Sequence, residues 1–191
     1  SNLGPNTRGN FCWGGAMAVT RKTFENPEIR EKWEGTLSDD FALTKVLNDA
    51  WIPIVFFPAA LTASVEGCTF GEMLEFTTRQ MKITRVYAAP LWILSFVGSG
   101  LFCTVMSAAL LIAALYPRNG PIVWISIATL AIVSVCSIGK AWLRLNAVRL
   151  ALVDHRSEID RQYWTQLTLW SLTPAIFLYN AAAALFSRRL K

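Results

Sequence analysis

Residues 88–116 read AAPLWILSFVGSGLFCTVMSAALLIAALY, a run of 29 residues without a charged side chain. This length exceeds the roughly 20 residues that a helix needs to cross a bilayer. A buried core helix of a soluble protein is the alternative, but such helices seldom run this long. A turn rich in Pro, Asn and Gly follows, and a second uncharged run covers residues 121–139. The sequence therefore predicts a helical hairpin that crosses the membrane twice.

A third segment, residues 163–186, is less apolar and contains Thr, Ser, Gln and Asn side chains as well as Pro174. A basic tail follows it at 187–191. If the segment spans, this tail lands outside, against the preference of basic flanks for the cytoplasm. We expect a membrane-embedded helix, and two topologies stay open: a full span, or a helix broken near Pro174 with both ends in the cytoplasm.

Charge is divided unequally along the chain, whose formal net charge is +5. Residues 1–87 carry 9 Lys and Arg against 10 Asp and Glu, whereas residues 88–191 carry 9 against 3. The positive-inside rule puts the basic loop 140–162 in the cytoplasm. Two crossings separate this loop from residues 1–87, so the sequence predicts a multi-pass membrane protein with a cytoplasmic soluble part and with Asn119 outside. The basic residues of the loop are Lys140, Arg144, Arg149, Arg156 and Arg161.

The soluble part combines features of strands and helices. The hydrophobic content of the whole chain, 53%, excludes disordered and collagen-like proteins. Residues 11–20 (FCWGGAMAVT) suit a buried strand, and residues 51–58 (WIPIVFFP) suit a short strand with an edge marked by proline. Gly14 and Gly15 permit close approach of the backbone to a ligand. A tight turn is the alternative for the Gly pair. Asn26 and Gly35 punctuate one helix, and Ser38 can cap a second helix that runs to about Ala50.

The acidic pair Asp39 and Asp40 opens this second helix. One interpretation is purely structural, because the helix dipole favours negative charge in the first turn. The other is that a carboxylate at a helix start, under a cleft, acts as a general base. Metal binding has less support, since the four cysteines form no CxxC pair and have no His neighbour. We expect no metal site in this chain.

An amphipathic helix is predicted over residues 68–87, directly before the first membrane span. Apolar residues such as Met73 and Met81 share one face, and Glu75 and Arg79 are four residues apart on another. A helix of this kind lies along the membrane interface. Its basic residues either contact anionic lipid or bind phosphate; they are Arg79, Lys82 and Arg85.

The order of these features resembles the C-terminal half of membrane-bound family 2 glycosyltransferases, and most closely the ceramide glucosyltransferase-like enzymes of sphingolipids and hopanoids. The resemblance implies an α/β fold, with residues 1–67 as the C-terminal part of a cytosolic GT-A catalytic domain. Residues 68–87 would be its interfacial helix. Residues 88–191 would be an all-α membrane domain of two to three transmembrane helices, with spans at about 88–116, 121–139 and 163–186. The bacterial relatives imply an inner-membrane location.

The resemblance also implies roles for individual residues. Asp40 matches the family's catalytic base, with Asp39 as its neighbour. The interfacial (Q/R)xxRW motif of the family falls on Phe76–Gln80, so that Arg79 takes the place of the diphosphate-binding Arg and Gln80 replaces Trp. Lys82 is the alternative donor-diphosphate contact. The acceptor-binding segment of the family corresponds to Cys12, Trp13, Gly14 and Gly15.

The implied activity is inverting transfer of a sugar from a nucleotide-sugar donor to a hydroxyl of a membrane lipid. The family holds its divalent metal, Mg or Mn, through an Asp-x-Asp motif, and this sequence contains none. We therefore expect the C-terminal part of a longer enzyme, inactive alone, whose partners are the donor, the lipid acceptor and the bilayer but no nucleic acid. Two alternatives remain: a polysaccharide synthase of the same family, and a non-catalytic membrane anchor or subunit.

Overall fold

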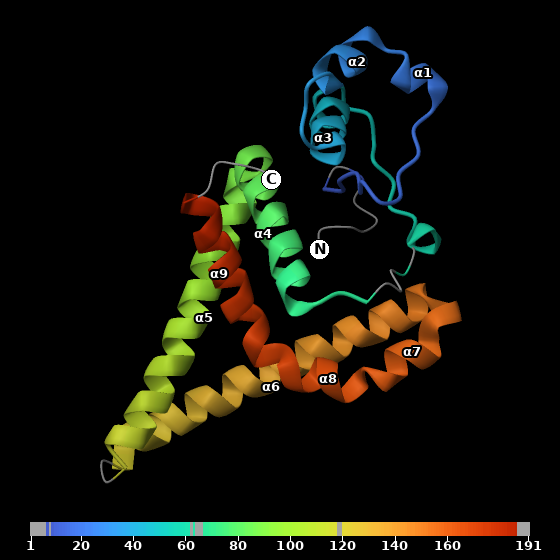
Figure 1. Ribbon diagram of the computed structural model, residues 1–191. Coiled ribbons are helices and arrows are strands. Elements are labelled where there is room, and N and C mark those ends of the chain that lie inside the picture. Colours follow the sequence, from blue (N-terminus) through green and yellow to red (C-terminus); the bar gives the residue numbers. More distant parts are fainter. Residues whose placement is uncertain (1–6, 8, 62, 64–66, 118–119, 187–191) are drawn as a thin grey trace. The chain divides into compact units, whose positions relative to one another are not determined.

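The computed structural model describes residues 7, 9–61, 63, 67–117 and 120–186 (Figure 1). The expected position of Asn119 and the basic tail at 187–191 lie outside the described residues. The chain divides into two compact units, one of residues 1–65 with 86–88 and one of residues 66–85 with 89–191. Each unit is described by itself below.

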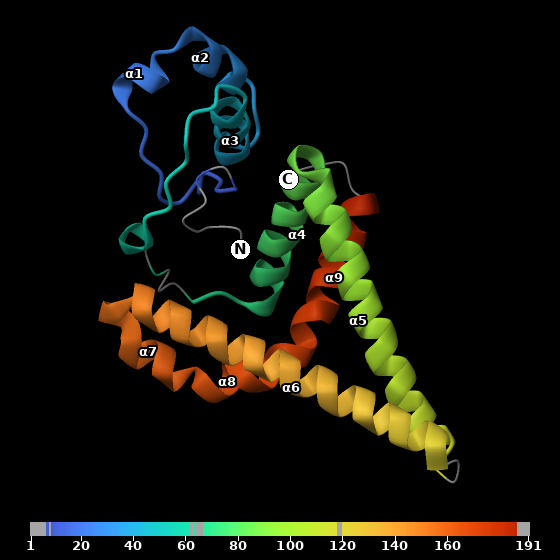
Figure 2. The same cartoon turned by 180° about the vertical axis from the view of Figure 1, so that it is seen from behind.

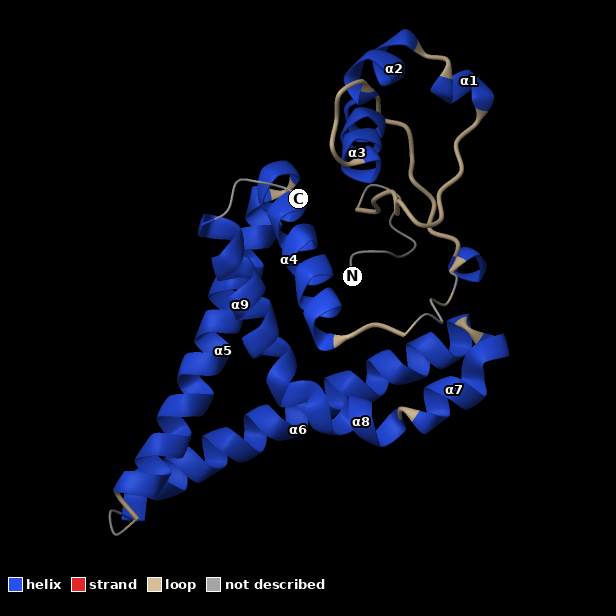
Figure 3. Ribbon diagram, viewed as in Figure 1, coloured by secondary structure: helices blue, strands red, loops and turns tan. Residues whose placement is uncertain are grey.

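The described residues are helices and loops without a β-strand, so the expected α/β GT-A domain is wrong (Figure 3). The first unit contains α1 (Arg21–Phe24), α2 (Pro27–Trp33), α3 (Asp39–Asp49) and the 3-10 turn η1 (Pro58–Ala60). The helices that follow are α4 (Phe70–Tyr87), α5 (Ala89–Leu115), α6 (Gly120–Ala151), α7 (Arg156–Arg161), α8 (Tyr163–Thr168) and α9 (Leu172–Phe186), with 3-10 turns η2 (Val153–His155) and η3 (Leu169–Ser171).

Both segments expected to be strands are extended or turned chain that lacks a regular backbone ladder. Trp13–Ala16 is a turn, in which the Ala16 N–H donates to the Trp13 carbonyl over 3.0 Å. In the second segment, the Ile54 N–H donates to the Thr7 carbonyl over 3.3 Å, and the buried Asn10 side chain donates to the Ile54 carbonyl over 2.9 Å. A side-chain amide thus takes the place that a neighbouring strand occupies in a sheet.

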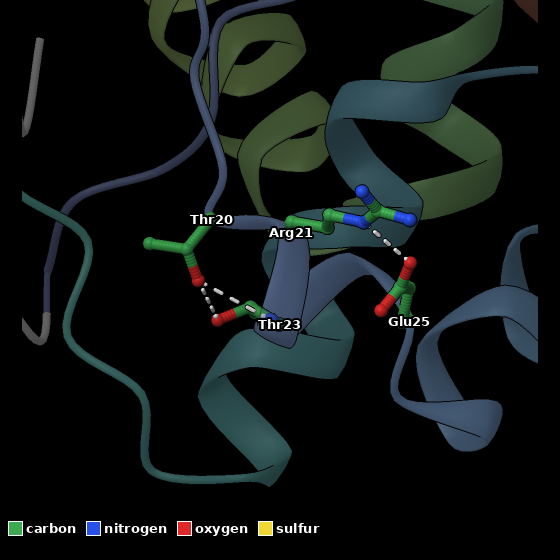
Figure 4. A network of polar contacts seen from close by, with 4 residues as sticks. All are labelled: Thr20, Arg21, Thr23 and Glu25. Atoms are coloured by element: carbon green, nitrogen blue, oxygen red, sulfur yellow. Dashed lines mark hydrogen bonds and ion pairs between the residues drawn. The ribbon is translucent and has the colours of Figure 1, made fainter.

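Local capping explains where the short helices begin and end. Thr20 caps α1, since its Oγ1 accepts a hydrogen bond from the Thr23 N–H over 3.2 Å, and Arg21 pairs with Glu25 at 2.7 Å (Figure 4). Gly35, just beyond α2, has a φ of 72°, a conformation that favours glycine after a helix end. The predicted stop at this glycine is therefore confirmed.

α3 provides one wall of the core of the first unit. Its buried side chains Leu43, Val46 and Leu47 pack with residues from α2 and from the two extended segments. The helix ends in a Schellman motif, in which the Ile52 N–H donates to the Leu47 carbonyl over 2.8 Å. Trp51 occupies the position where glycine is usual and has a φ of 58°. The other core members are Cys12, Ile29 and Ile54.

α4 begins with a capping box. The Glu72 carboxylate accepts hydrogen bonds from the Thr69 N–H and hydroxyl over 2.7 and 2.8 Å, and the Glu72 N–H donates back to Thr69 Oγ1 over 3.3 Å. These two donations by Thr69 lower the pKa of Glu72 below its ordinary value. The reciprocal pattern satisfies orphan donors of the first turn and fixes the start of the amphipathic helix.

Three helical stretches are long and apolar enough to cross a membrane: Ala89–Leu115, Gly120–Ala151 and Tyr163–Phe186. Most apolar side chains of the first two are exposed, as on a lipid-facing surface. α5 packs against both α6 and α9, as the front and back views agree (Figure 2). Gly100 lies at the contact with α9, where a Cβ would stand 3.8 Å from Leu178 Cδ1.

The third stretch is interrupted. α8 packs along α6 and α9 packs along α5, with the 3-10 turn η3 between them. Pro174 has no N–H to donate to the carbonyl four residues earlier, that of Trp170, and its ring disfavours a continuous helix there. The Thr173 hydroxyl satisfies the Leu169 carbonyl over 3.3 Å. Of the two alternatives left open for this segment, the break near Pro174 corresponds to the interruption at residues 169–171, just before the proline, whereas the whole stretch remains long and apolar enough to span.

Polar contacts join α4 to α9. Asn180, 2% exposed, accepts a hydrogen bond from the Thr78 hydroxyl and donates one to the Thr77 hydroxyl, each over 2.8 Å. The Arg85 guanidinium donates to the carbonyls of Ala184 and Leu185 over 2.5 and 3.2 Å. A cation at the C-terminal end of a helix satisfies its last carbonyls, so Arg85 stabilises α9.

Candidate functional site

The acidic pair stands at the start of α3, as the sequence predicts. Ser38 is the N-cap residue, but its side chain makes no capping bond to the backbone and instead contacts Asp40 Oδ1. The Asp39 carboxylate accepts a hydrogen bond from the Asp40 N–H over 3.0 Å. Both carboxylates thus lie in the first turn, where the helix dipole stabilises their negative charge.

Asp40 presents its two oxygens differently. Oδ1 accepts hydrogen bonds from the Ser38 hydroxyl and from the Phe41 N–H, the latter over 2.8 Å. Oδ2 takes part in none of the hydrogen bonds found among the described residues, and it faces Gly14. A Cβ on Gly14 would stand 3.3 Å from this oxygen and 3.4 Å from Asp39 Oδ1. The turn at Gly14 therefore lies next to the acidic pair, with room for no more than a hydrogen at this position unless the neighbouring atoms shift by a few tenths of an ångström.

Thr44 holds the segment of Cys12 against α3. Its hydroxyl accepts a hydrogen bond from the Cys12 N–H over 2.8 Å and donates one to the Asp40 carbonyl over 2.7 Å. Burial raises the pKa of the Cys12 thiol, a hydrogen bond with Thr44 lowers it, and the negative charge of Asp40 raises it further. The structure thus brings Cys12, Gly14, Asp39 and Asp40 together from the two sequence motifs.

Gly15 serves a packing role beside Trp13. A Cβ on Gly15 would lie 2.9 Å from the indole Nε1 of Trp13, closer than real side chains come. The Trp13 ring, which is 55% exposed, therefore lies over a glycine that leaves room for it. The two glycines thus have different neighbours: Gly14 lies beside the carboxylates and Gly15 beside the indole of Trp13.

An apolar cavity of about 530 Å³ adjoins this turn. Cys12 and Trp13 line it on one side, and Leu43 and Leu47 of α3 contribute to its floor. The extended segment 52–57 also lines the cavity, together with Ala60 and Leu61. This segment was not predicted as part of a site, although its run of apolar side chains is the signal in the sequence that indicates a cavity wall.

The residues predicted to bind the donor diphosphate lie on α4, in the second unit. Arg79 and Gln80 are exposed, and Lys82 is half-buried. No observation tests their role, which stays a prediction. Arg85, the further candidate on this helix, is engaged with the carbonyls at the end of α9.

A divalent metal implied by the resemblance needs several oxygen ligands. Within the described part of the chain, no group of three or more His, Cys, Asp or Glu side chains comes together to hold a metal ion. Asp39 and Asp40 supply two carboxylates, and one oxygen of each is already hydrogen-bonded within the turn. The resemblance puts the Mg²⁺ or Mn²⁺ on an Asp-x-Asp motif that this sequence does not contain, and the acidic pair does not replace that motif.

Comparison with known proteins gives no relative from which a role could be transferred. No protein-family model matches the chain, and neither the curated proteins nor the solved structures provide a match.

Proposed function

We propose that the acidic pair and the apolar cavity form the acceptor side of a glycosyltransferase, which moves a sugar from a nucleotide-sugar donor to the hydroxyl of a membrane lipid. The observation that carries the proposal is the position of Gly14 beside Asp40 Oδ2, where even a Cβ would come within 3.3 Å of the oxygen. A residue without a side chain leaves this oxygen uncovered, and Oδ1 is held by Ser38 and Phe41. The carboxylate is thus oriented with one oxygen available to a substrate.

In the proposed reaction Asp40 Oδ2 takes the proton of the lipid hydroxyl. The hydroxyl oxygen forms a bond to the anomeric carbon as the bond to the diphosphate breaks, and that electron pair leaves with the diphosphate. Attack opposite the leaving group inverts the anomeric centre. The apolar cavity beside Trp13 suits the hydrocarbon part next to such a hydroxyl. We place the first unit on the cytoplasmic side of a bacterial inner membrane.

A second function is favoured by a different observation. The Asp40 N–H bonds to Asp39 and the Phe41 N–H bonds to Asp40, and such contacts also stabilise a helix start without any catalysis. In that case the chain is a membrane anchor or subunit, and the acidic pair only fixes α3. A polysaccharide synthase would use the same base but release a water-soluble polymer.

The test uses membranes from cells that express the complete gene, supplied with radiolabelled nucleotide sugars. We expect label in the organic-extractable lipid, and we expect Asp40→Asn to reduce the rate about 10²–10⁴-fold. The matched control is Asp49→Asn, an exposed carboxylate at the other end of the same helix, which should leave the rate unchanged. An Asp40→Asn rate within a few-fold of wild type would favour the anchor, and labelled polymer in the aqueous phase would favour the synthase.

A further inference from the structure

α6 extends well beyond the apolar part of its sequence. At about 1.5 Å per residue, its 32 residues extend for about 48 Å, against a hydrocarbon core of about 30 Å. Lys140 is the first charge in the helix, and Arg144 follows one turn later. Trp142 and Trp164, exposed at this level of the helical pair α6 and α8, are typical of the membrane–water interface. Arg144 therefore belongs at the depth of lipid headgroups.

A pocket of about 280 Å³ lies at this place between α6, α7 and α8. Its lining combines apolar and polar side chains. Leu145, Val148 and Ile159 are apolar, whereas Arg144, Gln162 and Gln166 bring one cation and two amide groups. This is the composition that an amphipathic ligand with a negatively charged head needs.

Arg144 is held but not neutralised. Its Nη2 donates to Gln166 Oε1 over 3.2 Å, which orients the guanidinium while most of its five N–H donors remain for a ligand. Lys140 lies four residues earlier on the same helix and shares its face. Arg144 lines the pocket, and Lys140 adds positive charge one turn away on α6.

Two nearby acidic residues, Asp160 and Glu158, contact side chains outside the pocket. Asp160 forms an ion pair with Arg149, whose guanidinium also lies 5.4 Å from the centre of the Tyr163 ring. Glu158 contacts His155 over 2.8 Å. Neither carboxylate lines the pocket. The Arg149 contacts also hold α7 and α8 against α6, so the pocket is built by the fold.

We propose that this pocket binds the phosphate of an anionic glycerophospholipid, with Arg144 and the two glutamines on the phosphate and the apolar wall along the glycerol and the first acyl carbons. The site is separate from the acidic pair of α3 and requires no catalysis. A lipid is the inferred source of the phosphate because the cation and the aromatic residues stand at headgroup depth and the walls are partly apolar.

The full chain is delipidated and titrated with phosphatidylglycerol or phosphatidylcholine in mixed micelles, and bound lipid is counted by native mass spectrometry. We expect a saturable phosphatidylglycerol site. Arg144→Gln should weaken it about tenfold or more, as expected for the loss of a charge-assisted contact. Gln166→Glu keeps the shape and the acceptor oxygen but sets a carboxylate beside Arg144, and it should weaken binding similarly. Arg156→Gln, an exposed cation on α7, is the control and should change binding less than about twofold.

Several results would overturn the proposal. Equal losses in Arg156→Gln and Arg144→Gln mean diffuse attraction to anionic lipid. Equal retention of phosphatidylcholine means that negative headgroup charge is not selected. Displacement of phosphatidylglycerol by the same concentration of inorganic phosphate means a free-anion site. Helix content from circular dichroism verifies that each variant is folded, and the two pocket variants act independently, so that one suffices if the other does not fold.

Discussion

Gly14→Ala is the sharpest perturbation of the proposed site. The new methyl group would stand 3.3 Å from Asp40 Oδ2 and 3.4 Å from Asp39 Oδ1. The distance to Asp40 Oδ2 is slightly too short for carbon and oxygen, and a shift of a few tenths of an ångström relieves it, whereas the distance to Asp39 Oδ1 is ordinary van der Waals contact. Gly14 is exposed, so the turn can move outward and α3 should remain folded. The methyl group nevertheless covers Oδ2 on the side from which we expect the acceptor hydroxyl to approach.

The protein groups move little, but the methyl group would hold the acceptor hydroxyl about 1 Å from its productive position, which costs roughly 10²-fold in rate. We therefore expect a loss of this size for Gly14→Ala in the membrane transfer assay. Gly67→Ala is the matched control, because its Cβ would meet nothing within 4 Å. Rates within a few-fold of wild type for Gly14→Ala, together with an inactive Asp40→Asn, would refute the reasoning that Oδ2 receives the proton from the side of Gly14.

Three further predictions concern pH dependence and stability. Burial and the charge of Asp40 raise the pKa of Cys12, so alkylation of Cys12 should need a higher pH in the native protein than in the unfolded protein, and Asp40→Asn should lower that pH. The raised pKa also makes the free energy of unfolding depend on pH: its contribution to stability is present below the pKa of Cys12 in the unfolded chain and is lost as the pH rises through the pKa in the folded protein. Trp51→Gly should stabilise the first unit by about 1 kcal/mol by relieving a left-handed conformation, measured as slower trapping of the buried Cys12, whereas Trp51→Ala should give no such gain. Asn180→Ala leaves the Thr77 and Thr78 hydroxyls without their partner and should cost about 1–3 kcal/mol, measured by thermal unfolding in detergent; an unchanged midpoint would contradict the role of this contact in joining α4 to α9.

The membrane helices were predictable because a segment that is long and uncharged must satisfy its own backbone hydrogen bonds in lipid, and a helix does this without any specific partner. The structure has helices at each of the three expected segments, with α6 continuing to Ala151 instead of ending near Gly139. Its final turns keep Ala141 and Leu145 buried against the hairpin of α7 and α8. The basic residues of this stretch suggested a loop, yet Lys and Arg are good helix formers and continue α6 into the interface.

The strands were not predictable in the same way, because a strand depends on partners that local sequence does not reveal. Residues 51–58 have the β-branched and aromatic character of a buried strand, and the chain there is extended. What satisfies Ile54 is the Asn10 amide and the Thr7 carbonyl. An extended segment with one side-chain partner is not a ladder, and the GT-A expectation depended on that ladder.

The position of the acidic pair in the first turn of α3 was predicted correctly, for a reason that does not depend on the fold. Ser38-Asp39-Asp40 begins a helix because short polar side chains and negative charge favour the first turn, and the Gly pair makes a turn because glycine permits it. Local sequence does not predict that the Gly pair and the acidic pair lie side by side. Their proximity depends on Thr44, one turn into α3, whose hydroxyl bonds both the Cys12 N–H and the Asp40 carbonyl. Thr44→Val keeps the side-chain shape but removes both bonds. It should therefore loosen Gly14 from the carboxylates and expose Cys12 to alkylation while α3 stays helical, and unchanged Cys12 protection in Thr44→Val would mean that apolar packing alone holds the two motifs together.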